Sequence, residues 1–170
     1  MERQRWVLMV YRLPREPSRH RVAVWRKLRD LGALYLPDGV AALPEDAVTR
    51  EQLEWLQLRG REAGGRATLW EALPNTVAES RDLVEAFRAA REEGYREVIK
   101  GAERIRRKAT LGAERASVLE EIAKVEREFR TERRRDYFRS PLRTEAAQAL
   151  RAARRMLVEA AADRRTTKYG

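Results

Sequence analysis

The chain contains no cysteine and only one histidine, His20, among its 170 residues. The absence of cysteine excludes disulfides, thiolate nucleophiles and thiolate zinc sites, and is typical of proteins from a reducing compartment. His20 has no carboxylate three or four residues further along the chain, so it is a poor metal ligand. We therefore predict no metal site and no catalysis of the Ser-His-Asp type.

Long hydrophobic runs are also missing. No apolar stretch approaches the ~20 residues that a membrane-spanning helix needs. The N-terminal residues Met1–Arg3 lead directly into a charged segment and contain no hydrophobic core of a secretory signal. These absences predict a cytoplasmic protein with no membrane partner.

The motifs of known enzyme classes are absent as well. Gly64-Gly65 is an isolated pair that matches neither a P-loop nor a dinucleotide-binding pattern. Carboxylates such as Glu120-Glu121 alternate with Arg and Lys, which is typical of charge pairing along a helix rather than of paired catalytic acids. We expect no enzyme activity and no cofactor.

Positive charge is what the chain has in excess. The formal net charge is +10, the pI is near 10.6, and 38% of the residues are charged. A field of this sign favours polyanions such as nucleic acid as partners. The alternative is compositional: Arg and Glu cover exposed helices without any functional partner.

The N-terminal part shows alternating strand and helix patterns. Residues 5–13 (RWVLMVYRL) form an apolar run without helical period and predict a buried central strand. A helix is predicted from Pro17-Ser18 to Gly32, followed by a hairpin around Pro37-Asp38-Gly39. Proline fixes φ, aspartate caps the turn and glycine takes a positive φ in such a turn.

A second helix and a fourth strand complete this part. The segment Thr49–Gln52 has the form of a capping box, and the helix that it begins is expected to end near Gly60 or Gly64-Gly65. Residues 66–73 predict the last strand. The order β-α-β-β-α-β predicts an α+β fold with a ferredoxin-like domain over residues 1–75, in which two helices cover one face of a four-stranded antiparallel sheet.

Only helical patterns follow. Thr76–Glu79 is a second capping box, and a helical stripe continues past Gly94, where a kink or a break is possible. Turns are predicted at Thr110–Gly112 and at Ser140-Pro141. Residues 76–165 therefore predict a bundle of about three long helices, and residues 166–170 a frayed tail.

Clusters of basic residues are the candidate functional groups, because arginine forms paired hydrogen bonds to phosphate and neighbouring aromatic rings can stack on bases. Arginine near a helix C-terminus also suits the helix dipole, and this alternative stays open for the clusters at helix ends. Four arginines within six residues (130–135) repel one another and favour an anionic partner. The predicted nucleic-acid-binding residues are Arg15, Arg19, Arg26, Lys27, Arg104, Arg107, Arg133, Arg134, Arg135 and Tyr137.

Four segments together resemble a known family. Residues 6–44, EQLEWL followed by AGG (51–65), FRAAREEGYREVI (87–99) and RRRDYFRSPLRTEA (133–146) are similar, in order and spacing, to the N-terminal domain of the chromate-resistance regulator ChrB. In that family this region precedes a chromate-responsive C-terminal domain, and the whole protein is a DNA-binding repressor of chromate efflux genes. The resemblance implies a transcription regulator that binds duplex DNA, with a sensor that a separate domain or protein supplies.

The N-terminal part is more distantly similar to the ferredoxin-like domains of PaaX-type repressors and of the small CRISPR-associated integration nuclease. In those relatives the first strand tends to end in Tyr-Asp, and in the nuclease the aspartate is a proposed metal ligand. Here the pair is Tyr11-Arg12, and a cationic side chain cannot bind Mg²⁺. The alternative to DNA binding is a non-enzymatic interaction module, and we expect a homodimer because the seam from Val118 to Phe129 needs a partner helix.

Overall fold

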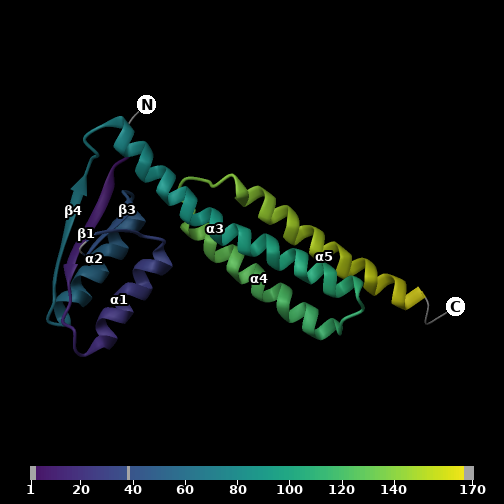
Figure 1. The fold of residues 1–170 in the computed structure, drawn as a ribbon. Coiled ribbons are helices and arrows are strands. Elements are labelled where there is room, and N and C mark those ends of the chain that lie inside the picture. Colours follow the sequence, from purple (N-terminus) through teal and green to yellow (C-terminus); the bar gives the residue numbers. More distant parts are fainter. Residues whose placement is uncertain (1–2, 38, 167–170) are drawn as a thin grey trace. The chain divides into compact units, whose positions relative to one another are not determined.

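The computed structural model describes residues 3–37 and 39–166, with side chains to residue 159. Within these residues the chain forms four strands and five helices, so the predicted α+β class is confirmed (Figure 1). The chain divides into two compact units, Met1–Phe87 and Arg88–Gly170, and the long helix α3 contributes to both. The predicted domain boundary after residue 75 stays a prediction. The predicted tail falls mainly on residues outside the described part.

The first unit contains the sheet. Its elements in chain order are β1 (Trp6–Arg12), α1 (Ser18–Leu31), β2 (Leu34–Leu36), β3 (Val40–Pro44), α2 (Ala47–Glu62) and β4 (Arg66–Ala72). The strands pair antiparallel in the order β2-β3-β1-β4, so β1 is central as the apolar run predicted. Helices α1 and α2 lie along one face of the sheet (Figure 1).

The strand register explains where the core of this unit lies. Val7 pairs with Leu43 and Met9 pairs with Ala41, so these four side chains share one face of the sheet, and all of them are completely buried. Val24, Leu28, Leu53 and Leu56 are buried on the two helices. The period-two pattern of the strands and the helical spacing of α1 and α2 therefore meet in one hydrophobic layer.

Turn chemistry places the element boundaries of the first half as predicted. Gly32 ends α1 with φ 74°, and its N–H donates to a carbonyl of the last turn. Gly39 has φ 79° in the β2–β3 hairpin, and a Cβ there would lie 2.5 Å from the carbonyl oxygen of Tyr11. Glycine is required at this position for both reasons. Asp38, the predicted capping residue of the turn, lies outside the described residues.

The predicted capping box at Thr49–Gln52 is wrong. Helix α2 begins three residues earlier than that box implies, at Ala47, with Asp46 instead of Thr49 as its N-cap. Asp46 Oδ1 accepts from Thr49 N at 2.8 Å, and Thr49 Oγ1 accepts from Asp46 N at 3.1 Å. Threonine therefore occupies the third helical position of the box, and its buried hydroxyl also donates to the Pro44 carbonyl. The helix ends at Glu62, between the two predicted positions.

The remaining helices are α3 (Val77–Thr110), α4 (Arg115–Arg135) and α5 (Leu142–Thr166). The capping box predicted at the start of α3 is confirmed, because Thr76 N donates to Glu79 Oε2 at 2.8 Å and Glu79 N donates to Thr76 Oγ1 at 3.1 Å. Helix α3 continues through Gly94, so the break considered there is absent. None of the helices in the described part of the chain combines the length and apolar character needed to cross a membrane.

Three helices share the core of the second unit. Tyr95 of α3 is fully buried in it, and its ring lies 5.9 Å from that of Phe129 on α4, centroid to centroid. The helical stripes that the sequence shows after residue 76 all contribute to this one cluster. Its buried residues are Tyr95, Val98, Ala102, Ile105, Val118, Ile122, Val125, Ala146, Leu150 and Ala153.

Candidate nucleic-acid interface

The positive charge of the chain is concentrated in one unit. Residues 1–87 contain 14 Lys and Arg and 13 Asp and Glu, which nearly cancel. Residues 88–170 contain 23 Lys and Arg and 14 Asp and Glu. Almost all of the net charge of +10 therefore belongs to the helical unit, and an anionic polymer is attracted mainly to that unit.

A groove between α4 and α5 gathers part of this charge. It has a volume of about 470 Å³ and an apolar base that includes Phe129, Ala147 and Leu150. Two arginines come from α4 and three from α5, whereas one carboxylate lines the groove. The charged residues are Arg130, Arg133, Arg143, Arg151, Arg154 and Glu126. We call this set the α4–α5 groove.

In the described part of the chain, Glu126 in the groove and Asp136 beside it pair with three of the five arginines and leave the other two without a carboxylate. Glu126 is shared by two of the arginines, with Arg154 Nε at 3.4 Å from Oε1 and Arg130 Nη1 at 4.0 Å from Oε2. Arg133 and Arg151 form no ion pair within the described residues, and both are exposed. Guanidinium groups that lack internal partners are available for an external anion.

The length of the groove suits an extended polyanion. Arg143 and Arg154 are eleven residues apart on α5, which corresponds to about 16 Å along the helix axis. One strand of a DNA duplex advances about 3.4 Å per nucleotide, so this row spans roughly five nucleotide steps. The arginines are therefore spaced for several phosphates and not for one small ion.

Buried polar contacts fix the turn at the end of this groove. Asp136 is 7% exposed, and each of its carboxylate oxygens accepts one hydrogen bond: Oδ2 from the Tyr95 hydroxyl at 3.0 Å and Oδ1 from Ser140 N at 2.9 Å. Arg143 Nη1 lies 4.0 Å from the same carboxylate. Burial, followed by the hydrogen bond to Asp136, raises the pKa of Tyr95 well above its usual value, so this phenol stays protonated and donates.

A second carboxylate, Glu132, holds two arginines beside this turn. Its oxygens lie 3.1 Å from Arg91 Nη1 and 3.2 Å from Arg135 Nη1, and the three side chains are only 13–15% exposed. Burial lowers the pKa of Arg91, and Glu132 opposes this effect. The Glu132 side chain passes over Gly94, where a Cβ would lie 2.6 Å from its Oε2. The glycine in the middle of α3 therefore makes room for this ion pair.

The predicted site residues at the end of α4 differ from one another in exposure and in their partners. Arg133 lines the α4–α5 groove. Arg134 is exposed on α4, whereas Arg135 turns to Glu132 and is largely buried. Tyr137 is partly buried in the turn after α4. Of this predicted cluster, Arg133 has the placement that best suits an external phosphate.

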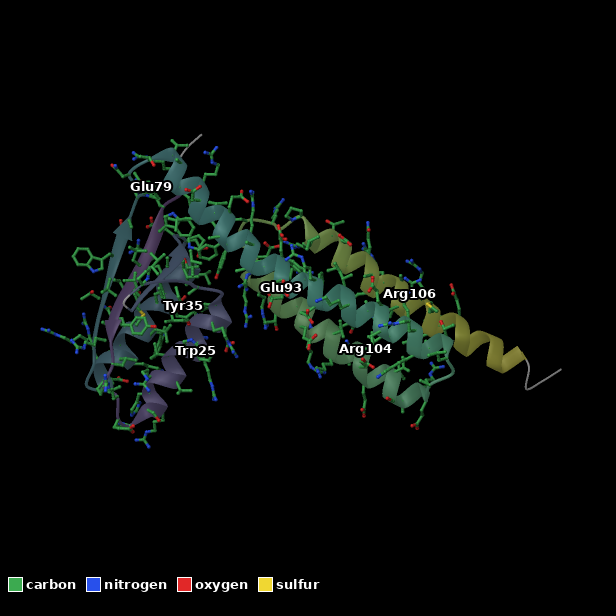
Figure 2. All side chains as sticks on the ribbon, viewed as in Figure 1. Trp25, Tyr35, Glu79, Glu93, Arg104 and Arg106 are labelled. Carbon is green, nitrogen blue, oxygen red and sulfur yellow. The ribbon has the colours of Figure 1, made fainter. Side chains whose placement is uncertain are left out.

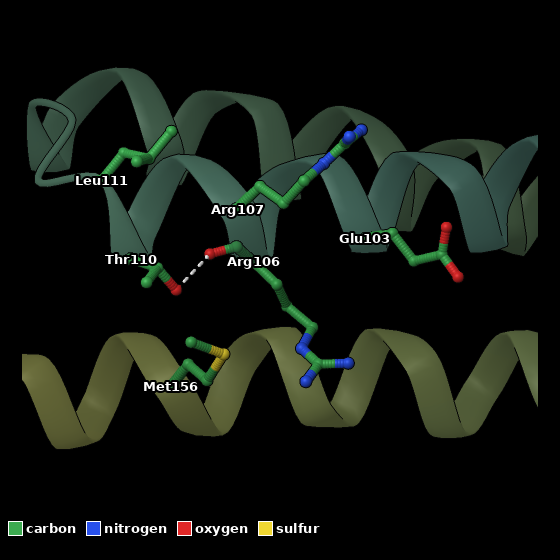
Figure 3. Close-up of a pocket in the computed structure, with 6 residues that line it drawn as sticks. All are labelled: Glu103, Arg106, Arg107, Thr110, Leu111 and Met156. Carbon is green, nitrogen blue, oxygen red and sulfur yellow. Dashed lines mark hydrogen bonds between the residues drawn. The ribbon is translucent and has the colours of Figure 1, made fainter.

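The predicted residues of α3, Arg104 and Arg107, have different surroundings. Arg104 points towards α4, and Arg106 points towards α5 (Figure 2). Arg104 Nε donates to Glu121 Oε1 at 2.7 Å, and Lys108 Nζ binds the other oxygen at 2.6 Å. Arg107 lines a different hollow, of about 600 Å³, together with Arg106 and other side chains of α3 and α5 (Figure 3).

The other predicted residues belong to the first unit. Arg15 precedes α1, and Arg19, Arg26 and Lys27 are exposed on that helix. Lys27 lines a groove between α1 and α2. His20 lines the same groove, and within the described residues no group of three His, Cys, Asp or Glu could hold a metal ion.

Sequence reasoning missed the contribution of α5. Arg143, Arg151 and Arg154 were not among the predicted residues, because they are spread along α5 and form no run as dense as Arg133–Arg135. The antiparallel packing of α5 beside α4 places them opposite Arg130 and Arg133. Their helical spacing of eight and three residues was the available signal, since it puts all three near one helix face.

Comparison with known proteins agrees with the resemblance seen in the sequence. A family model described as "Protein ChrB, N-terminal" matches residues 21–167, which is well over half of the chain. No curated protein matches significantly, and neither does any solved structure. The chain therefore belongs to the family of ChrB N-terminal domains.

Proposed function

We propose that this chain is a non-enzymatic regulatory domain that binds duplex DNA through the α4–α5 groove. The observation that carries the proposal is the set of five arginines against one carboxylate along this groove. Membership of the ChrB N-terminal family supports a regulatory role, because the resemblance to ChrB implies a domain of a repressor of chromate efflux genes. The match concerns the domain, so the proposal covers a DNA-binding domain and not a response to chromate by this chain alone.

The architecture supports the same assignment. The strand order β2-β3-β1-β4, with α1 and α2 following β1 and β3, is the order of a ferredoxin-like β-α-β-β-α-β domain. We propose this topology for the first unit and a three-helix bundle for the second unit. Such an arrangement separates a nearly neutral unit from a strongly basic one, and the basic one is suited to contact the nucleic acid.

The expected mode of binding follows from the residue types. Arginine binds phosphate with two parallel hydrogen bonds, and each neutralised phosphate releases counterions. Contacts of this kind position a protein on the duplex without reading its sequence. We therefore expect tight, salt-dependent binding from this groove, with base recognition supplied elsewhere.

The test is a salt titration of DNA affinity. The double variant Arg133→Gln/Arg151→Gln removes two exposed arginines that form no ion pair in the described structure. On a 30-base-pair duplex, the slope of log K against log salt should become shallower by about one unit per lost contact. The matched control, Arg96→Gln/Lys100→Gln, removes the same charge from α3, where both residues are paired with glutamates.

The control decides between local and bulk electrostatics. If both double variants flatten the slope equally, only the net charge matters and the groove is not the site. An unchanged slope in the groove variant also refutes the proposal. So does the absence of binding by the unmodified chain at ~50 mM salt, where phosphate contacts are strong.

A second candidate function is a protein interaction module, or a homodimer. It is favoured by apolar side chains exposed on the second unit: Leu111 is 86% exposed, Val158 68% and Leu119 44%. Leu111 also lines the hollow drawn in Figure 3. Sedimentation mass measured against protein concentration, with and without DNA, distinguishes the two, because a dimer formed through these residues assembles without DNA.

A further inference from the structure

A second groove lies in the first unit, between α1 and α2. Its volume is about 580 Å³, within the range of roughly 300–1,000 Å³ that is usual for small-molecule sites. The lining residues of α1 recur at helical spacing (20, 23, 24 and 27), and those of α2 recur in the same way. One ridge of each helix therefore faces the groove.

The base of this groove is apolar and one wall carries an indole ring. Val24 and Leu56 are 3% and 4% exposed and contribute the base, and Ala23 of α1 and Ala63 after α2 line the groove as well. Trp55 also lines the groove and is 57% exposed. An exposed aromatic ring beside an apolar base offers a flat surface on which a planar apolar ligand can bury area.

Cations from both helices line the same groove. Lys27 comes from α1 and Arg59 from α2, and neither forms an ion pair within the described residues. By contrast, Arg50 at the start of α2 is bound by two carboxylates, Glu45 and Glu71. One acidic residue, Glu62, lines the groove and leaves it with an excess of positive charge.

We propose that the α1–α2 groove binds a small organic acid with a planar apolar body. The apolar body packs on Trp55 and Leu56, and the carboxylate is bound by Lys27 and Arg59. A second copy of the chain that docked through this same face would bring the same cations to the groove, so like charges disfavour that occupant. The proposal goes beyond DNA binding, and it does not depend on the α4–α5 groove.

The test uses 2-naphthoate as the anionic probe and 2-naphthamide as its neutral counterpart. Each is titrated into the full ¹⁵N-labelled chain while the indole N–H signals of its four tryptophans are followed. We expect 2-naphthoate to shift the Trp55 signal, assigned with Trp55→Phe, and to leave that of Trp70 on β4 unchanged. The amide should bind at least about tenfold more weakly, because it lacks the charge that strengthens the hydrogen bonds.

Variants locate the charge recognition. Lys27→Met/Arg59→Met keeps apolar stems in the groove and should weaken 2-naphthoate by about tenfold or more. The control Arg21→Met/Arg26→Met removes the same charge from exposed positions of α1 that do not line the groove, and should leave the affinity unchanged. Equal weakening by both pairs of substitutions would overturn the proposal.

Three further results would also overturn it. Equal binding of the acid and the amide would show that no anion is recognised. No shift of the Trp55 signal at millimolar 2-naphthoate would show that the groove is not a site for this class of ligand. A Trp55 signal that moves when the protein alone is diluted would show that a second copy covers the groove.

Discussion

Replacing Gly94 by alanine should destabilise the chain, although alanine is the better helix former. In an ordinary helix interior this change stabilises by about 1 kcal/mol. Here the added Cβ would lie 2.6 Å from both Cγ and Oε2 of Glu132, which is too close for either atom to remain in place. The carboxylate must move, and it then loses its contacts with Arg91 at 3.1 Å and Arg135 at 3.2 Å.

The size of the loss follows from the burial of these groups. The three charged side chains are 13–15% exposed, so solvent replaces the lost contacts poorly. Hydrogen bonds to charged groups contribute about 1.5–3 kcal/mol each. After subtraction of the gain in helix propensity, we expect Gly94→Ala to lower the free energy of unfolding by about 2 kcal/mol. This corresponds to a fall in Tm of about 4–8 °C.

The assay is a double-mutant cycle with Glu132→Ala, followed by chemical denaturation with helical circular dichroism as the signal. Glu132→Ala alone should be strongly destabilising because it leaves two arginines without their carboxylate. In that background the space above Gly94 is empty, so Gly94→Ala should now stabilise by about 1 kcal/mol. The reasoning is refuted if Gly94→Ala stabilises the unmodified chain, or if its effect has the same sign in both backgrounds.

Three other changes test the contacts described above. Asp136→Asn should lower the free energy of unfolding by about 1–3 kcal/mol, because both carboxylate oxygens accept hydrogen bonds and an amide has one acceptor oxygen. Since burial and, secondly, the Asp136 carboxylate raise the pKa of Tyr95, an ultraviolet titration of this variant should show the Tyr95 phenol ionising at lower pH. An unchanged titration would contradict this. Thr76→Ala should cost about 1 kcal/mol in a denaturant titration, because it removes the N-cap of α3, and no change in midpoint would show that the cap contributes nothing. Hydrogen bonds from Lys108 and Arg104 hold the pKa of Glu121 below its usual value of 4.5. The stabilisation of the folded chain by these hydrogen bonds is therefore fully present above about pH 4.5 and is lost on further acidification. Lys108→Gln should therefore reduce the difference in Tm between pH 6 and pH 3, and an unaltered difference would argue against the pairing.

Local signals predicted the elements well where the deciding residues are neighbours in the chain. The Thr76–Glu79 box and the glycine that ends α1 act within a few residues, and the structure confirms both. The box of α2 was misplaced although it is equally local. The Thr49–Gln52 pattern fits the motif as well as the true pair Asp46 and Thr49 does, and the contact of Thr49 with Pro44 contributes to the outcome.

Gly94 shows where such reasoning stops. As a helix-weakening residue it suggested a break, but the helix is continuous because the glycine faces a charged side chain 38 positions further along the chain. Arg135 belongs to a run of arginines that looks uniform in sequence, yet it is held inside by Glu132 while Arg133 faces the groove. Helical periodicity separates the faces of one helix, but it does not say what lies opposite each face.

The sequence by itself determined the class of fold, the central strand, the helical second half, the excess of positive charge and the family. These follow from composition, periodicity and motif order, which are properties of neighbouring residues. Only the tertiary structure decided which arginines share a groove and which are bound by buried carboxylates. The packing of α4 against α5 brings Arg133 and Arg151 to one surface, and no local pattern contains the contact that unites them.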